Sequence, residues 1–373
     1  MQFELDEDLR EAAQLAGEVF AQLAGTVRVR EVESRRGGHD EELWGILAET
    51  GILGLALPEE HGGSGLGMLG LVAVLEQQGR RVAPVPFAAA VAMAALPLVS
   101  WGTPTQRDRW LPGFLEGKHL VVGAIDAGVD GDYAVRGERD GDGWRISGTL
   151  TAVQGAAQAA ALLVPVMTDD GVLAVLLPAD RDGVQRESVS MTNHAAAAAV
   201  TLTAVHIGTD EVLTGGGAAI AQARMLGRIA LAAIQSGVCE EAIAITAAYT
   251  SERIQFNRPL SANQAVSARA ADAHLDAERI KLTTRRAAWL VDRNDDGAEA
   301  ASLVASWWAA HGGLRVVHAT QHLHGGMGAD VDYPIHRYFL WGRQNAYSLG
   351  SAPVLMAELG SMLETVPMIG TPA

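Results

Sequence analysis

The sequence predicts an α+β protein in which a helical N-terminal part, a β-rich middle part and a helical C-terminal part follow one another. Three observations support this order: apolar residues at helical spacing before residue 118, short β-prone runs over 119–212, and long stripes of small and apolar residues after Gly217. A length of 373 residues suits two or three packed units. We therefore expect domains at 1–118, 119–212 and 213–373.

Helices are predicted throughout the first part. The first carries one apolar stripe with alternating spacings of three and four residues, which is typical of a helix with one buried face. A second helix is expected at 40–50, further helical segments at about 68–100, and a short helix at 105–115 that contains Pro112. A glycine-rich connector lies between the second helix and the segments that follow. The stripe of the first helix consists of Leu5, Leu9, Ala12, Ala16, Val19 and Leu23.

The middle part is rich in short β-prone runs that are separated by Asp-Gly and Gly-Asp-Gly turns. No convincing helix of ten or more residues interrupts them, so we expect an antiparallel sheet or barrel in place of alternating strands and helices. The runs are 119–125, 133–136, 144–147, 161–166, 172–177 and 199–205.

Long helices return in the last part. Small and apolar residues line one face from Ile220 to Ile245, which permits close approach of a neighbouring helix. Two more helices are expected at 262–293 and 298–321, and a last one at 352–363. This part is predicted to be a helical bundle.

Charge and cysteine content exclude several classes of protein. There are 28 basic and 44 acidic residues, a net charge of −16, which disfavours binding of nucleic acid or of an anionic membrane surface. The single cysteine, Cys239, allows neither an intrachain disulfide nor a cysteine cluster for metal, and it fits a reducing compartment. The N-terminus lacks the pattern of a signal peptide, and the longest strongly apolar stretch, 87–99, is too short to span a bilayer. We expect a cytoplasmic location.

Four short motifs have simpler explanations than a catalytic site. Gly63-Ser-Gly-Leu-Gly67 fails the dinucleotide-binding spacing, and the turn that begins at His324 lacks the serine elbow of a hydrolase. His322 and His324 have no acidic or cysteine partner at metal-ligand spacing, so no metal is expected. The Trp307-Trp308 pair lies on an apolar helical stripe, which favours core packing.

Two segments are more informative. Arg253-Ile-Gln-Phe256 closes a long helix and is followed by Gln264, and a guanidinium with an amide at a helix end suits a pyrophosphate. Gln321-His-Leu-His-Gly-Gly-Met-Gly328 contains glycines that let backbone amides approach an anion.

These segments make the sequence resemble the acyl-CoA dehydrogenase family over almost its whole length. Leu53-Gly-Leu-Ala-Leu-Pro-Glu-Glu-His-Gly-Gly-Ser-Gly-Leu66 resembles the family's N-terminal connector. The Arg253–Phe256 stretch with Gln264 resembles its R-x-Q-F-G…F-Q stretch, although Asn257 stands in place of the glycine and Asn263 in place of the phenylalanine. His324-Gly-Gly-Met-Gly328 with Asp332-Tyr-Pro334 resembles its H-G-G-x-G…E-Y-P stretch, preceded by His322 where the family has glutamine.

The resemblance implies a C-terminal four-helix bundle and FAD held between subunits. It also implies an acyl-CoA substrate, fatty acid β-oxidation or related lipid metabolism, and an electron-transfer flavoprotein as electron acceptor. The residues it assigns to cofactor binding are Arg253, Phe256, Gln264, Gln321, His322, Gly325 and Gly326.

Departures from the family pattern concern catalysis. The family removes an α-proton of the thioester with a glutamate while the β-hydride goes to the flavin. Counted from the Tyr-Pro pair, that glutamate falls on Leu349, and the family's alternative base position falls on Gly227. Neither side chain accepts a proton, so no catalytic residue is predicted in this chain. On the side of the flavin ring, 125–132 replaces the T-E-P-G-x-G-S-D loop and 152–155 replaces W-I-T-N.

The base and the ring-side segments are thus replaced, whereas the Arg253 and Gly325-Gly326 segments are kept. This contrast predicts a non-catalytic subunit that completes the FAD site of a catalytic acyl-CoA dehydrogenase partner in an α₂β₂ heterotetramer. The sequence resembles the base-less partner of the actinobacterial heteromeric enzymes that degrade steroid side chains. Two alternatives remain: a self-sufficient homomer whose base has moved to Asp330, Asp332 or Asp126, and a flavin-free scaffold of the same fold.

Overall fold

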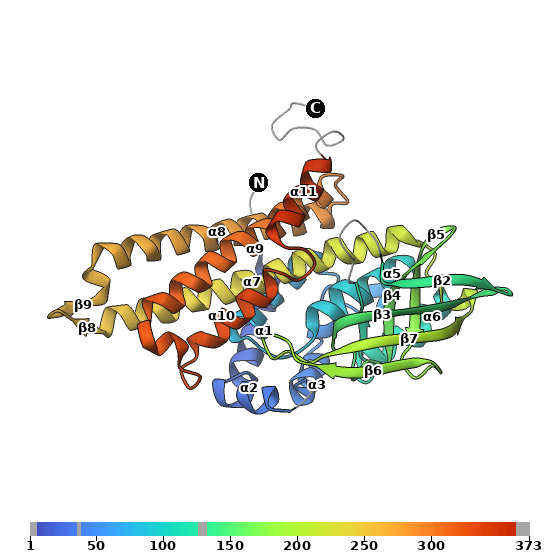
Figure 1. Ribbon diagram of the computed structural model, residues 1–373, viewed down its shortest axis with the longest axis horizontal. Helices are drawn as coiled ribbons and strands as arrows, with labels where there is room; N and C mark the ends of the chain where they lie inside the picture. The colour runs from blue at the N-terminus through green and yellow to red at the C-terminus, as the bar shows by residue number, and fades with distance from the viewer. Residues whose placement is uncertain (1–5, 36–38, 126–132, 363–373) are drawn as a thin grey trace. The chain divides into compact units, whose positions relative to one another are not determined.

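The computed structural model describes residues 6–35, 39–125 and 133–362 and confirms the α+β class (Figure 1). Helices come first, a curled sheet follows, and helices return at the C-terminal side. The Cα positions divide the described residues into two compact units. Of the described residues, the first unit comprises 6–21, 72–83 and 228–362, and the second comprises 22–35, 39–71, 84–125 and 133–227. The domain boundaries at 118 and 212 stay predictions.

The N-terminal helices begin and end where local signals place them. Asp40 caps one helix by accepting a hydrogen bond from the backbone N–H of Leu43 at 3.2 Å. Thr103 and Gln106 form a reciprocal capping box at another, with Pro104 in its first turn. Residues 88–95 form a fully buried π-helical segment. The helices are α1 (Glu7–Leu23), α2 (Thr26–Glu33), α3 (Glu41–Glu49), α4 (Gly67–Arg81), α5 (Leu96–Trp101) and α6 (Pro104–Leu115).

A seven-stranded sheet occupies the described residues of the middle part, in the order β1-β4-β2-β3-β7-β6 with β5 paired to β4. Most neighbours are antiparallel, as expected, but β4 runs parallel to both β1 and β2. Two parallel neighbouring strands need a long crossover connection between them. For β1 and β4 the chain segment that contains the hairpin of β2 and β3 makes this connection. The strands are β1 (Val121–Gly123), β2 (Val135–Asp140), β3 (Gly143–Gln154), β4 (Ala161–Thr168), β5 (Gly171–Pro178), β6 (Val184–Val189) and β7 (Ala197–Ile207).

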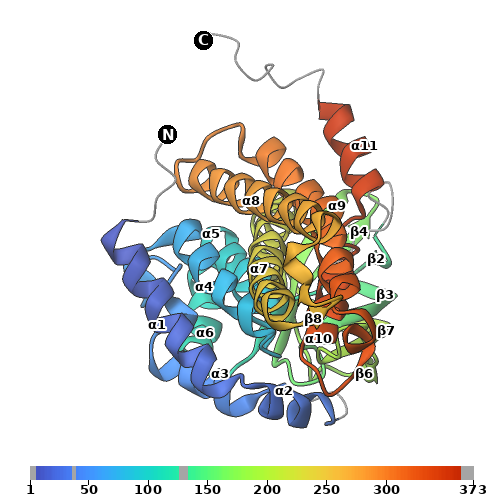
Figure 2. The same cartoon turned by 90° about the vertical axis from the view of Figure 1, so that its left-hand side faces the viewer.

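The C-terminal helices form the predicted bundle, seen nearly end-on in Figure 2. Helix α10 was not expected from the sequence; its buried side chains Ile335, Tyr338 and Trp341 lie three residues apart. Gly342 of α10 sits so close to α9 that a Cβ there would lie 2.4 Å from Val317. The helices are α7 (Gly217–Glu252), α8 (Gln264–Asp292), α9 (Ala298–Leu323), α10 (Ile335–Asn345) and α11 (Ala352–Met362).

Helix α7 is long and apolar enough, by length and composition, to cross a membrane. Two thirds of its most apolar window is buried inside the protein, as in the core helix of a bundle. Glycines let α4 approach it within the first unit: a Cβ on Gly237 would lie 1.9 Å from the carbonyl oxygen of Glu76, and one on Gly79 would lie 2.1 Å from that of Ile234. Only glycine permits such a crossing.

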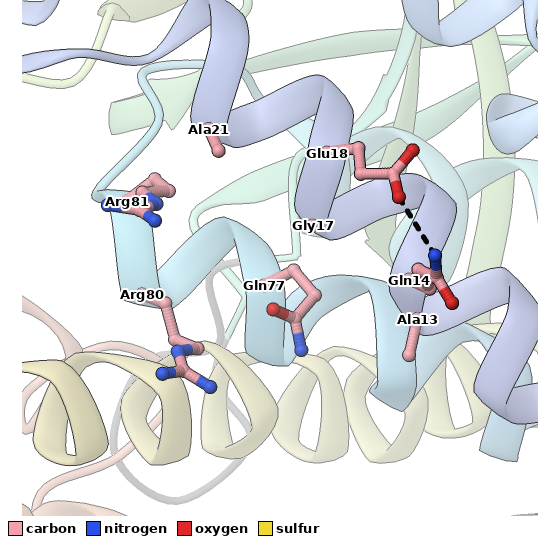
Figure 3. A pocket seen from close by; sticks show the side chains of 8 residues that line it. All are labelled: Ala13, Gln14, Gly17, Glu18, Ala21, Gln77, Arg80 and Arg81. Carbon is pink, nitrogen blue, oxygen red and sulfur yellow. Dashed lines mark hydrogen bonds between the residues drawn. The ribbon is translucent and has the colours of Figure 1, made fainter.

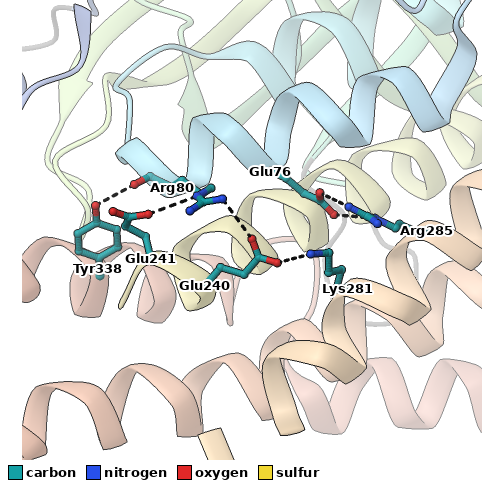
Figure 4. Close-up of polar contacts among 7 residues, drawn as sticks. All are labelled: Glu76, Arg80, Glu240, Glu241, Lys281, Arg285 and Tyr338. Carbon is teal, nitrogen blue, oxygen red and sulfur yellow. Dashed lines mark hydrogen bonds and ion pairs between the residues drawn. The ribbon is translucent and has the colours of Figure 1, made fainter. Parts of the chain in front are cut away.

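Buried charges join α4, α7 and α8 in the first unit (Figure 4). Glu76 is 3% exposed, and its carboxylate accepts two hydrogen bonds from Arg285, at 3.2 and 2.8 Å. Burial raises the pKa of the Glu76 carboxyl above its usual value, and the hydrogen bonds from Arg285 oppose that shift. A second series of ion pairs lies beside this one and runs through Lys281, Glu240, Arg80 and Glu241.

Candidate functional site

A short hairpin between α7 and α8 carries Phe256 and is flanked by two more predicted cofactor-binding residues, Arg253 and Gln264. Strands β8 (Ile254–Gln255) and β9 (Arg258–Pro259) are joined by Phe256 and Asn257, which have φ of 53° and 59°. Left-handed geometry at both turn residues is that of a type I′ turn, which favours glycine or asparagine. Asn257 therefore preserves the backbone that the family's glycine would allow.

The predicted cofactor-binding residues at this hairpin are exposed. Phe256 is 92% exposed, and Arg253 and Gln264 are exposed as well. Arg253 directly follows α7, and its carbonyl oxygen accepts a hydrogen bond from the N–H of Leu260 at 2.9 Å. Gln264 begins α8, with Asn263 as the capping residue. The structure thus brings Arg253, Phe256 and Gln264 onto one projecting segment (Figure 1).

The second predicted segment, at the end of α9, is an open turn. Gly325 has φ of 58°, and a Cβ on Gly325 or Gly326 would meet nothing within 4 Å, so the backbone there is accessible. The side-chain N–H of Gln321 donates to the carbonyl oxygen of Gly328 at 2.8 Å, and that amide thereby closes the turn. His322 is exposed.

His324 connects the two segments. Its ring is buried, stacks on Tyr249 of α7 with centroids 4.5 Å apart, and also contacts Tyr333. Its Nδ1 lies 2.8 Å from the carbonyl oxygen of Thr320, and burial lowers the pKa of the ring. Tyr249 lies one turn before Arg253, so this stack brings the glycine turn to the end of α7 that carries the hairpin. Sequence reasoning missed Tyr249 and named Tyr333 only within the Asp332-Tyr-Pro334 motif, because their contacts with His324 join residues far apart in the chain.

The predicted base positions lack a carboxylate. Leu349 follows α10 in a left-handed conformation with φ of 56°. Its carbonyl oxygen accepts a hydrogen bond from Nε of Arg228 at 3.2 Å, and Nη2 of Arg228 pairs with Glu358 of α11 at 2.6 Å. The second base position, Gly227, directly precedes Arg228 in α7. A buried guanidinium therefore lies beside the position where the resemblance implies a glutamate.

The candidate relocated bases show no catalytic arrangement among the described residues. The side chain of Asp330 accepts a hydrogen bond from the backbone N–H of Asp332 at 2.9 Å, which is a local turn contact. Asp332 is exposed. Asp126 lies outside the described residues.

An open groove of about 400 Å³ lies between α1 and α4 in the first unit (Figure 3). Its one carboxylate, Glu18, accepts a hydrogen bond from Gln14 at 2.9 Å. None of the predicted site residues lines it, so this groove is not the site that the sequence predicts. The lining residues are Ala13, Gln14, Gly17, Glu18, Ala21, Gln77, Arg80 and Arg81.

Comparison with known families accounts for this arrangement. Residues 6–118 match the N-terminal domain of acyl-CoA dehydrogenases, and residues 214–362 match their C-terminal domain. The chain belongs to the acyl-CoA dehydrogenase family. The resemblance inferred from the motifs is confirmed.

Individual relatives include chains of two solved acyl-CoA dehydrogenase-like structures, one of which is named a steroid enzyme. The chain is 35% identical over 346 residues to the acyl-CoA dehydrogenase FadE27 of Mycobacterium tuberculosis, covering 91% of this chain and 92% of that protein. It is 42% identical to a chain of a variant of the Tcur3481-Tcur3483 steroid acyl-CoA dehydrogenase, with a TM-score of 0.91 and coverage of 97% and 99%. It is 33% identical to a chain of the ChsE4-ChsE5 complex of M. tuberculosis, with a TM-score of 0.93 and coverage of 98% and 100%.

Acyl-CoA dehydrogenases of this fold are FAD-binding flavoproteins, so the residues of this chain can be tested against a flavin. On the ring side they fit poorly: Ala152 is an exposed methyl on β3 where the family has tryptophan, and Gly155 packs so close to Pro86 that a Cβ would lie 2.9 Å from its Cβ. The replaced loop at 126–132 lies outside the described residues. On the hairpin side they fit better, because Arg253 and the backbone of Gly325 and Gly326 are accessible.

Proposed function

We propose that this chain is the non-catalytic subunit of a heteromeric, FAD-dependent acyl-CoA dehydrogenase. It lacks its own glutamate base and completes the FAD site of a catalytic partner, two copies of each chain forming the assembly. The observation that carries the proposal is the residue type at the two base positions, Leu349 and Gly227, neither of which has a carboxylate. A general base needs a carboxylate at that place, within reach of the substrate's α-proton.

The exposed hairpin supports the second half of the proposal. Arg253 is a permanent cation with a forked donor geometry, which suits the diphosphate of a flavin nucleotide held by the neighbouring subunit. Backbone N–H groups of the Gly325–Gly326 turn would contribute further donors to the same anion. FAD, when bound, supplies the acceptor for the β-hydride. In this chain the residues that suit that cofactor are exposed.

The relatives support the choice of substrate class. One is named a steroid acyl-CoA dehydrogenase, and another belongs to a complex of two differently named chains. We propose that the acyl group is a thioester-linked side chain of a bulky ring system, that electrons pass to an electron-transfer flavoprotein, and that the enzyme acts in the cytoplasm.

The test is co-expression of this chain with a glutamate-bearing acyl-CoA dehydrogenase chain from the same organism. We expect the complex to retain FAD and to reduce an artificial electron acceptor with acyl-CoA. We also expect this chain alone to be nearly colourless, and its Leu349→Glu variant to stay inactive alone and to leave the activity of the complex unchanged.

A matched change in the partner completes the experiment. Replacing the partner's own glutamate base by glutamine should abolish turnover while FAD stays bound. Turnover that survives this replacement would place the base in this chain and favour the self-sufficient alternative. A complex that forms without flavin would favour the scaffold.

A further inference from the structure

We propose that Arg186 is a positioning residue that holds the ring-side segment of this chain, residues 152–159, in a fixed conformation without a flavin. The segment begins with the four positions where the family has W-I-T-N, and it lies in the second unit together with Arg186. The inference rests on the proposed function and deepens it, because it concerns the side on which this chain fits a flavin ring poorly.

One nitrogen of Arg186 meets three backbone carbonyl groups of the ring-side segment. Its Nη1 donates to the carbonyl oxygens of Ala156, Ala157 and Ala159 at 3.0, 3.2 and 2.9 Å. Arg186 lies on β6, the last strand in the order of the sheet, whereas the three alanines follow β3. The side chain therefore ties the turn after β3 to a strand that comes later in the chain.

The turn after β3 needs a donor from elsewhere in the chain. Ala156, Ala157 and Ala159 carry only backbone polar groups, and Ala156 and Ala159 are 0% and 4% exposed. Backbone carbonyl groups that are withdrawn from water require a hydrogen-bond donor. These carbonyls lie between the end of β3 at Gln154 and the start of β4 at Ala161, outside the regular strand pairing. The guanidinium supplies the donor that the alanines cannot.

A close glycine contact fixes the beginning of the same turn. Gly155 has φ of 75°, and its N–H donates to the carbonyl oxygen of Ala196 at 2.9 Å. A Cβ on Gly155 would lie 2.9 Å from the Cβ of Pro86 and 3.2 Å from a methyl of Val122. The asparagine that the family has at this position would fit only if the segment or Pro86 shifted. The segment thus packs closely against its own chain.

These contacts give the ring-side segment a support that comes from the chain itself. Arg186 holds its end, Gly155 fixes its middle, and Ala152 at its start is exposed and offers a flavin ring only a methyl group. The segment therefore keeps one conformation that does not depend on a cofactor. It forms a fixed wall of the subunit in place of a loop that a flavin orders.

Hydrogen exchange by mass spectrometry on the full-length chain tests this hold. The backbone N–H groups of residues 155, 156, 158 and 159 are hydrogen-bonded, so they report on opening of the turn. Arg186→Met keeps the apolar stem and removes the donors. We expect these amides to exchange about 10-fold faster in this variant, the lower end for a hydrogen bond with a charged group, because Arg186 is exposed.

Arg186→Lys separates a donor site from general packing. Three oxygens converge on one nitrogen, and an ammonium offers three donors from a single atom. Lysine should therefore restore slow exchange, which methionine does not. Arg145→Met is the matched control, because Arg145 is an exposed arginine on β3 whose side chain donates to the carboxylate of Asp140 at 3.1 and 2.7 Å. It should leave exchange of 152–159 unchanged.

A second arm repeats the measurement with FAD added to this chain alone. We expect exchange of 152–159 in the wild type to stay the same. The proposal is overturned if Arg186→Met leaves the turn protected, if Arg186→Lys does not restore protection, if Arg145→Met accelerates the turn equally, or if FAD slows exchange of the segment. Turnover of the complex, measured with the partner's base replaced, tests the proposed function separately, so the two can fail independently.

Discussion

Replacing Glu76 by glutamine removes the carboxylate from a buried ion pair while keeping the size of the side chain. Its partner Arg285 has a side chain that is 15% exposed, and the two are joined by hydrogen bonds at 3.2 and 2.8 Å. The change leaves a largely buried guanidinium with one neutral acceptor. We therefore expect Glu76→Gln to lower the free energy of unfolding substantially.

The magnitude follows from the contacts. Each hydrogen bond to a charged group contributes roughly 1.5–3 kcal/mol, and glutamine keeps one acceptor oxygen of the two. Breaking a buried pair on one side costs about 3–5 kcal/mol, and the partial exposure of Arg285 places this case at the lower end, about 3 kcal/mol. Replacing both partners, in Glu76→Leu with Arg285→Met, should recover most of the loss because no charge is then left buried.

Urea unfolding followed by circular dichroism measures the effect, with Glu116→Gln as the matched control. Glu116 pairs with Lys118 at the same distance of 2.8 Å, but the two side chains are 58% and 71% exposed. The control should be indistinguishable from the wild type, since solvent screens exposed pairs. Equal shifts for Glu76→Gln and Glu116→Gln, or a double variant less stable than Glu76→Gln, would refute the reasoning.

Three further predictions concern the helix crossing, the buried histidine and the hairpin. Gly237→Ala should lower the free energy of unfolding by about 1–3 kcal/mol, because its Cβ would lie 1.9 Å from the carbonyl oxygen of Glu76. Gly360→Ala, a helical site with nothing within 4 Å, should instead raise it by about 0.5–1 kcal/mol in the same urea titration. Burial lowers the pKa of His324 below its usual 6.5, so the unfolded chain binds the proton more readily and stability should fall as pH drops below about 6.5. Thermal melts from pH 8 to 5 check this, and His324→Phe should flatten the profile; an equally steep profile in the variant would assign the pH dependence to other groups. Arg253→Ala should reduce the FAD content of the assembled complex with little change in melting temperature, whereas unchanged FAD with a lower melting temperature would indicate a purely structural arginine.

Much of the fold could be predicted from the sequence because its signals are local. The apolar stripe of α1, the cap at Asp40 and the turns between strands each depend on residues within a few positions of one another. The order of the helical and β-rich parts could therefore be predicted from the sequence alone. The same holds for the absence of a carboxylate at 349 and 227, which is a matter of residue identity once the motifs fix the register.

The features that the sequence did not predict depend on packing between residues that are far apart in the chain. Helix α10 was not predicted from the sequence, and the burial of its side chains depends on the helices around it. The parallel pairing of β4 with β1 and β2 joins strands that are not neighbours in the chain. Arg228 contacts a carbonyl 121 residues away, and His324 stacks on Tyr249, so neither contact leaves a periodic trace in the sequence. Local periodicity records which face of an element is buried, but only the tertiary structure determines which distant group lies against that face.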